Sequence, residues 1–319
     1  MPASTSHWSS HDSISVKAAV LAGLFAHGRG ASIDPVTMVA KEETPMGPEF
    51  QQGRRTALIS AVSAVLTACG GGGSGEEVEP PAVGQVINST IPSVSNGNTY
   101  AIQVFLPESY ATSTTVLPVI YATEGDAPYG GPHRSRFDTF KEAMQRRGTQ
   151  AVLVGIGGTA SRGTDFLMPG ATKYLDFLVK ELVPRIESQY RIDRKRRALS
   201  GLSHGGYFVL AALVLEARAD VPPSFSHYLS TECSVGELSS PAAVLAFERQ
   251  IDGKTVPATL FLAGASNGNH PLIGIPLFNQ IATQNLPGQV TIKAEYNTSH
   301  VGADVPAFED ALERFFSKP

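Results

Sequence analysis

The sequence predicts an α/β fold in which a mostly parallel sheet is covered by helices on both faces. Short apolar, β-rich segments alternate along the chain with segments of helical periodicity, and this order is typical of parallel sheets. With 319 residues, of which 42% are hydrophobic and 17% charged, the chain can bury a large core. The functional residues of such a fold are expected after the strands, at their carboxyl ends.

Seven strands are expected from the apolar segments. Residues 99–106 alternate apolar and polar side chains before Pro107, which indicates an outer antiparallel strand. The other expected strands are short, strand-like apolar runs at residues 117–122, 151–156, 197–202, 226–229, 259–263 and 290–296.

The clearest helix has its apolar residues on one face, at Tyr174, Leu175, Leu178, Val179, Leu182, Val183 and Ile186. Pro184 should bend this helix, because proline removes one backbone hydrogen bond and crowds the preceding turn. Residues 207–215 are apolar nearly all round and predict a helix that is buried on most sides. The last helix is expected at residues 306–316.

Residues 54–68 have the pattern of a bacterial lipoprotein signal peptide. Arg54-Arg55 precedes an apolar stretch that is too short to span a bilayer, and Leu66-Thr67-Ala68-Cys69 resembles a lipobox. We expect cleavage before Cys69 and lipid attachment to its thiol, which would hold an exported protein at a membrane, in the periplasm or at the outer membrane. The alternative is a core helix that happens to end in cysteine.

Residues 69–85 are rich in glycine, proline and glutamate and predict a flexible tether before a folded domain at 86–319. Export signals normally begin a chain, yet residues 1–53 precede this one. We therefore expect residues 1–53 to be a wrongly assigned or non-structural extension, with translation starting at Met38 or Met46. The competing interpretation makes residues 14–26 the signal, although they lack a clear cleavage site.

Charge and cysteine content limit the partners of the chain. The net charge is -4 and no basic tract is present, so nucleic acid is not an expected partner. We also expect no cofactor and no metal. With Cys69 acylated, Cys233 would be the remaining thiol, so we expect a small buried side chain there and no internal disulfide.

Residues 198–206 run from an expected strand, through a tight turn, into an expected helix. Gly201-Leu202-Ser203-His204-Gly205 matches the G-x-S-x-G pattern of a nucleophile elbow in this context. Glycines allow the two chain segments to approach closely while the serine Oγ stays accessible. Ser203 is therefore the expected nucleophile, and the backbone N–H of His204 at the helix start would stabilise an oxyanion.

A serine hydroxyl needs a base to accept its proton, and in this order of elements the base is a histidine after the last strand. His300 lies there, whereas His133, His227 and His270 fit that position less well. The second oxyanion donor should follow the strand at 117–122, and we assign the backbone N–H of Asp126.

The acid that orients His300 is less clearly marked, because the loop at 264–270 contains no carboxylate. Glu232, just past the preceding strand, is the preferred residue. Asp304 is a second possibility, although it should lie near the cap of the last helix. The third is a dyad of serine and histidine with Asn267 or Asn269 in the place of the acid.

Several motifs together resemble the esterase D / ferric enterobactin esterase-like family of α/β hydrolases, over most of residues 86–316. They are residues 123–126, 154–158, 162–165, 174–184, Tyr190, Arg196-Arg197, the Ser203 elbow and the late His300. The resemblance implies an α/β-hydrolase fold and a serine esterase that cleaves small or oligomeric carboxylic esters, of siderophore or plant-polysaccharide type. An acyltransferase and a non-catalytic binding lipoprotein are the alternatives.

Arg162 belongs to the motifs that carry this resemblance and is a candidate substrate-binding residue. Its guanidinium could hold an anionic group of the substrate. The competing interpretation is an ion pair with Asp165, which lies one helical turn further along the chain.

Overall fold

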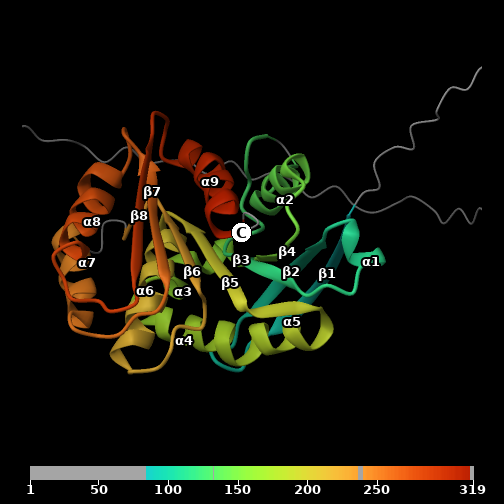
Figure 1. The fold of residues 1–319 in the computed structure, drawn as a ribbon, viewed down its shortest axis with the longest axis horizontal. Helices are drawn as coiled ribbons and strands as arrows, with labels where there is room; N and C mark the ends of the chain where they lie inside the picture. Colours follow the sequence, from blue (N-terminus) through green and yellow to red (C-terminus); the bar gives the residue numbers. More distant parts are fainter. Residues whose placement is uncertain (1–83, 132, 236–239, 317–319) are drawn as a thin grey trace, which may run out of the picture. The chain divides into compact units, whose positions relative to one another are not determined.

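The computed structural model describes residues 84–131, 133–235 and 240–316. Within them, eight strands form one sheet in the order β1-β2-β4-β3-β5-β6-β7-β8 (Figure 1). The strands are β1 (Gln85–Pro92), β2 (Thr99–Leu106), β3 (Leu117–Ala122), β4 (Val152–Ile156), β5 (Ile192–Leu202), β6 (His227–Thr231), β7 (Thr259–Ala265) and β8 (Val290–Tyr296). β2 is antiparallel to both neighbours, and β3 to β8 pair in parallel, which confirms the mostly parallel sheet.

The helices lie on both faces of the sheet, as expected. They are α1 (Ser109–Thr112), α2 (Arg136–Arg147), α3 (Arg162–Asp165), α4 (Gly170–Phe177), α5 (Val183–Gln189), α6 (His204–Arg218), α7 (Pro241–Glu248), α8 (Ile275–Ile281) and α9 (Asp304–Phe316). α2 and α9 cover one face of the sheet, and the larger group that includes α4, α6 and α8 covers the other (Figure 1).

Two apolar clusters fill the space between the sheet and its helices. Because successive strand residues point to opposite faces, Val119 and Tyr121 of β3 join one cluster, whereas Ile120 and Ala122 join the other. All four side chains are at most 2% exposed. Burial on both faces explains why this strand appears in the sequence as a continuous apolar run.

One expectation about the elements needs correction. Residues 99–106 form an antiparallel strand, but β1 lies outside it, so β2 is not the outermost strand. β1 is exposed along most of its length, so its sequence has no clear strand pattern. Its first residue, Gln85, is the last residue of the expected tether. At Pro184 the helix passes through a π-helical turn, Leu178–Leu182, and the N–H of Val183 donates to the carbonyl of Leu178. This turn accommodates the N–H that proline lacks.

The expected signal peptide at 54–68, Cys69, the extension at 1–53 and the tether up to residue 83 lie outside the described residues. Within the described part of the chain, every helix is too short or too polar to cross a bilayer.

Candidate active site

Ser203 lies between the end of β5 and the start of α6, at the carboxyl edge of the sheet. Its φ of 61° and ψ of −117° are unusual for a residue with a Cβ, and such backbone strain is typical of a nucleophile elbow. A hydrogen bond holds this turn against β6, since the N–H of Ser203 donates to the carbonyl of Thr231 (3.0 Å). A Cβ at Gly201 would lie 2.2 Å from the carbonyl oxygen of Gly205, so the close approach requires glycine there.

His300 and Glu232 form a hydrogen-bonded pair beside the elbow. His300 lies in the loop after β8, and its Nδ1 is 2.7 Å from Oε2 of Glu232, which follows β6. The glutamate side chain is fully buried and the imidazole is half-buried. A carboxylate bound to Nδ1 fixes the ring so that Nε2 is free to face a nucleophile.

Glu232 is held as a carboxylate by the loop after β7. Its Oε1 accepts from the N–H of Ala265 (2.6 Å) and of His270 (3.2 Å), and its Oε2 accepts from the N–H of Asn269 (2.8 Å). Burial acts to raise the pKa of Glu232, but hydrogen bonds from His300 and from these amides outweigh burial and lower the pKa. Glu232 is therefore ionised at neutral pH.

Among the described residues, neither Asp304 nor the side chains of Asn267 and Asn269 form a hydrogen bond with the imidazole of His300. Asp304 is fully buried and is paired with Arg136. Asn269 contributes its backbone N–H to Glu232. Of the three alternatives, the geometry therefore favours Glu232 as the partner of His300, and its catalytic role stays a prediction.

The described residues show no hydrogen bond between the hydroxyl of Ser203 and His300. Such bonds are often long without substrate and shorten in the reacting complex. Charged side chains nevertheless surround the residue after the nucleophile. Burial lowers the pKa of His204, and the charges of Arg162 and His300 lower it further. Arg162 and His300 therefore lie close enough to His204 for their charges to affect its imidazole.

The loop after β3 approaches the elbow as expected. The carboxylate of Asp126 accepts from the backbone N–H of Gly158 (3.1 Å) and of Thr159 (3.2 Å), and so joins this loop to the one after β4. The N–H of Asp126 has no acceptor among the described residues. The hydroxyl of Tyr129 donates to the carbonyl of Val301 (2.6 Å), next to His300. The N–H groups of Asp126 and His204 remain the predicted oxyanion donors.

Arg162 makes an ion pair with a residue that sequence reasoning missed. Its Nε is 2.7 Å from Oε1 of Glu124, a carboxylate only 6% exposed, and the ion pair with Asp165 that the competing interpretation expected does not form. Asp165 instead accepts from the hydroxyls of Tyr100 (2.7 Å) and Ser161 (2.5 Å). The side chain of Arg162 is 36% exposed, and among the described residues its guanidinium is held by the ion pair with Glu124 and by no hydrogen bond, so it is anchored on one side and accessible on the other.

Glu124 lies next to the elbow itself. A Cβ at Gly205 would be 3.0 Å from Oε2 of Glu124, which measures how closely this carboxylate approaches the start of α6. Its position before Gly125 in the loop after β3 was the available signal, but a long-range pairing with Arg162 cannot be inferred from spacing. No group of three or more His, Cys, Asp or Glu side chains in the described part of the chain is arranged to bind a metal.

The sequence is similar to those of known esterases. A family profile described as putative esterase matches residues 93–230. The ferri-bacillibactin esterase BesA of Bacillus subtilis (strain 168) is 29% identical over 151 residues, which cover 37% of this chain and 48% of BesA. The match therefore spans about half the length of that relative.

Two solved structures share the fold. An IroE-like serine hydrolase from Shewanella oneidensis is 24% identical, with a TM-score of 0.62 over 73% of this chain and 80% of that chain. The siderophore hydrolase EstA from Aspergillus nidulans is 19% identical, with a TM-score of 0.61 over 76% of this chain and 97% of that chain. These likenesses establish the α/β-hydrolase fold that the sequence predicts.

Proposed function

We propose that this chain, which is similar to putative esterases and to a ferri-bacillibactin esterase, hydrolyses carboxylic esters through an acyl-enzyme formed on Ser203. The observation that carries the proposal is the pairing of His300 with the buried Glu232 beside a strained Ser203 elbow. A nucleophile, a base and a carboxylate that orients the base are the parts that acyl transfer requires.

In the first half of the reaction, Nε2 of His300 accepts the proton of the Ser203 hydroxyl as Oγ attacks the ester carbonyl carbon. Glu232 holds Nδ1 and stabilises the imidazolium that forms. The N–H groups of His204 and Asp126 stabilise the oxyanion of the tetrahedral intermediate. When the intermediate collapses, His300 gives its proton to the departing alcohol and the acyl group stays on Ser203.

In the second half, water replaces the alcohol. His300 removes a proton from the water as its oxygen attacks the acyl carbon, and then returns that proton to Oγ of Ser203. The products are a carboxylic acid and the free enzyme. An acyltransferase would use the same steps with another alcohol in place of water, so analysis of the products separates the two activities.

We assign the substrate to esters of siderophore type. The support is the name of the curated relative, a ferri-bacillibactin esterase, together with the open guanidinium of Arg162 beside the elbow. An arginine that is fixed by Glu124 on one side can bind a carboxylate, a phenolate or another anionic group of the substrate on the other. Arg162 would then hold an anionic ester with its scissile bond near Ser203.

We further propose that the protein is exported and is anchored to a membrane by lipid on Cys69. The support is the sequence of residues 54–69, with its paired arginines, short apolar stretch and lipobox-like end. Expression of the full chain with Cys69→Ser tests this proposal. The native protein should partition into a detergent phase and the variant into the aqueous phase, whereas equal partitioning would contradict it.

The proposed activity is tested by assaying the full-length protein on a panel of esters, with products identified by mass spectrometry. The panel contains a neutral aryl ester, a ferric catecholate trilactone and a feruloylated sugar. We expect hydrolysis of the aryl ester and the trilactone, and loss of both activities in Ser203→Ala. Equal hydrolysis by native protein and Ser203→Ala would contradict the mechanism.

A further inference from the structure

Helices α2 and α9 both begin beside the candidate site and are joined there by a buried ion pair. Arg136 is the first residue of α2, and Asp304, just after His300, is the first residue of α9. Nε of Arg136 is 2.7 Å from Oδ2 of Asp304, and Nη2 is 2.9 Å from Oδ1. The two side chains are 1% and 0% exposed. The contact is thus a two-pronged arginine–carboxylate pair that is closed to solvent.

The same guanidinium contacts two other segments of the site. Nη1 of Arg136 donates to the carbonyl of Thr123 (2.6 Å), at the start of the loop that carries Asp126. Nη2 donates to the hydroxyl of Ser200 (3.1 Å), on β5 just before the elbow. One side chain therefore contacts the nucleophile strand, the expected oxyanion loop and the helix that follows the base.

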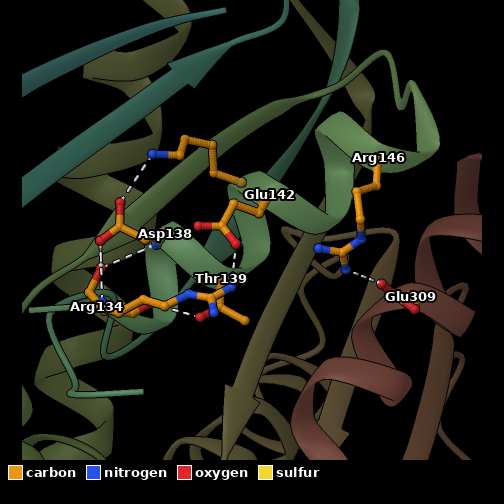
Figure 2. A network of polar contacts seen from close by, with 8 residues as sticks. Arg134, Asp138, Thr139, Glu142, Arg146 and Glu309 are labelled. Atoms are coloured by element: carbon orange, nitrogen blue, oxygen red, sulfur yellow. Dashed lines mark hydrogen bonds and ion pairs between the residues drawn. The ribbon is translucent and has the colours of Figure 1, made fainter. Parts of the chain in front are cut away.

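The position of Arg136 is not explained by the stability of α2. A cation in the first turn of a helix faces the positive end of the helix dipole, which is unfavourable. The start of α2 is already capped by Ser135, whose hydroxyl and backbone N–H exchange hydrogen bonds with Asp138 in a capping box; Figure 2 shows this network at the start of the helix.

The packing of α2 on α9 also has contacts other than the buried pair. The rings of Phe140 and Phe308 stack between the helices with their centroids 3.7 Å apart. At the other end of α2, Arg146 is paired with Glu309 at 2.6 Å (Figure 2). Buried ion pairs are expensive to desolvate and are weak evidence for a stabilising role.

Arg136 nevertheless stays charged in this place. Burial acts to lower the pKa of its guanidinium, but the charge of Asp304 and the hydrogen bonds to it outweigh burial and raise the pKa. All of its hydrogen-bond acceptors are oxygens on segments that lead to site residues, and its guanidinium also lies over the ring of Phe140. A fixed cation with this set of partners can hold these three segments of the site in fixed positions relative to one another.

We propose that Arg136 and Asp304 are positioning residues, which together set the His300 loop relative to Ser203 and to the N–H of Asp126. This inference rests on the proposed function, because it assumes that these three groups meet during catalysis. Small displacements of such groups lower the rate of the chemical step, while substrate binding, which depends on other contacts such as Arg162, is largely retained.

The test compares kcat and KM of full-length Asp304→Asn and Arg136→Lys, expressed per active site titrated by a fluorophosphonate. We expect kcat to fall about tenfold or more in each variant with KM within about threefold of the native value. The double variant should lose little more than the single variants, because the two residues act as one unit. Arg146→Gln, which removes a different, solvent-exposed ion pair between α2 and α9, is the matched control and should keep the native kcat.

Native kcat per titrated site in both single variants, with only a lower melting temperature, would overturn the inference. Arg136→Lys retains the charge and loses the two-pronged geometry, so its kcat tests the positioning role if Asp304→Asn does not fold. Ser203→Ala is assayed in parallel. Activity in Ser203→Ala would contradict the proposed function, whereas an inactive Ser203→Ala beside native turnover in the two single variants would contradict the positioning role alone.

Discussion

Nδ1 of His300 lies 2.7 Å from Oε2 of Glu232, although 68 positions separate the two residues in the sequence. The pair meets because β6 and β8 both end at the carboxyl edge of the sheet, with β7 between them. The loop after β7 contains no carboxylate and instead supplies the amides that hold Glu232. The candidate acid thus comes from the neighbouring strand, and the β7 loop serves as its support.

Glu232→Gln should lower kcat by about a hundredfold or more, because a neutral amide neither stabilises an imidazolium nor selects the correct tautomer of His300. The variant should also lose about 1–3 kcal/mol of unfolding free energy, since Oε1 and Oε2 accept three backbone N–H groups. Steady-state kinetics and urea unfolding measure the two effects. Asn267→Ala is the control, and a comparable loss of kcat in that variant would favour the asparagine-assisted dyad.

Arg162→Gln should raise KM for anionic esters by about tenfold and leave KM for a neutral aryl ester within about twofold, because only an anion gains from the guanidinium. Glu124→Gln should shift KM in the same direction by a smaller factor, since Arg162 loses its charged anchor. Kinetics on a matched anionic and neutral ester pair check this prediction. An equal change for both esters would show that Arg162 has only a structural role.

Gly201→Ala should destabilise the fold by roughly 2 kcal/mol or more, because the new Cβ would lie 2.2 Å from the carbonyl oxygen of Gly205 and the backbone of the elbow must move. Urea unfolding measures the loss. Gly163→Ala is the control, because a Cβ there meets no atom within 4 Å and alanine suits a helix better than glycine. Equal stability of the two variants would argue against a tightly closed elbow.

His227 should make the folded state less stable as the pH falls from about 6.5 to about 4. Burial, and then the charge of Arg196, lowers the pKa of His227 to about 4, so the unfolded chain binds the proton first. The native protein should therefore lose on the order of 1–3 kcal/mol across this window, an effect partly screened by solvent.

Urea unfolding of His227→Gln and native protein at several pH values measures this loss. The variant should show a flatter dependence of unfolding free energy on pH between about 4 and 6.5. His133→Gln, which changes an exposed histidine, should follow the native curve. Parallel curves for native protein and His227→Gln would contradict the assignment.

Local sequence signals were sufficient for the elements that carry the site. Residues 117–122 and 290–296 are strands with the expected bounds, and the glycine-flanked Ser203 forms the strained turn that its neighbours indicate. β1 was missed because an exposed edge strand needs no apolar pattern.

The pairings of charged residues could not be predicted in the same way. Arg136 and Asp304 are 168 positions apart, and their burial depends on how α2 packs against α9. Glu124 is close to Arg162 because the loops after β3 and β4 lie side by side at the sheet edge. The expected ion pair of Arg162 with Asp165 was wrong because Tyr100 and Ser161 already occupy that carboxylate. Sequence spacing describes local geometry, whereas these contacts are set by topology.

The most direct test is to treat the full-length protein with a fluorophosphonate and locate the adduct by peptide mass spectrometry. We predict one adduct, on the peptide that contains Ser203, with no labelling of Ser203→Ala and labelling slowed at least about a hundredfold in His300→Ala. Failure of the native protein to react, or an adduct on another residue that persists in Ser203→Ala, would contradict the assignment of Ser203 as the nucleophile.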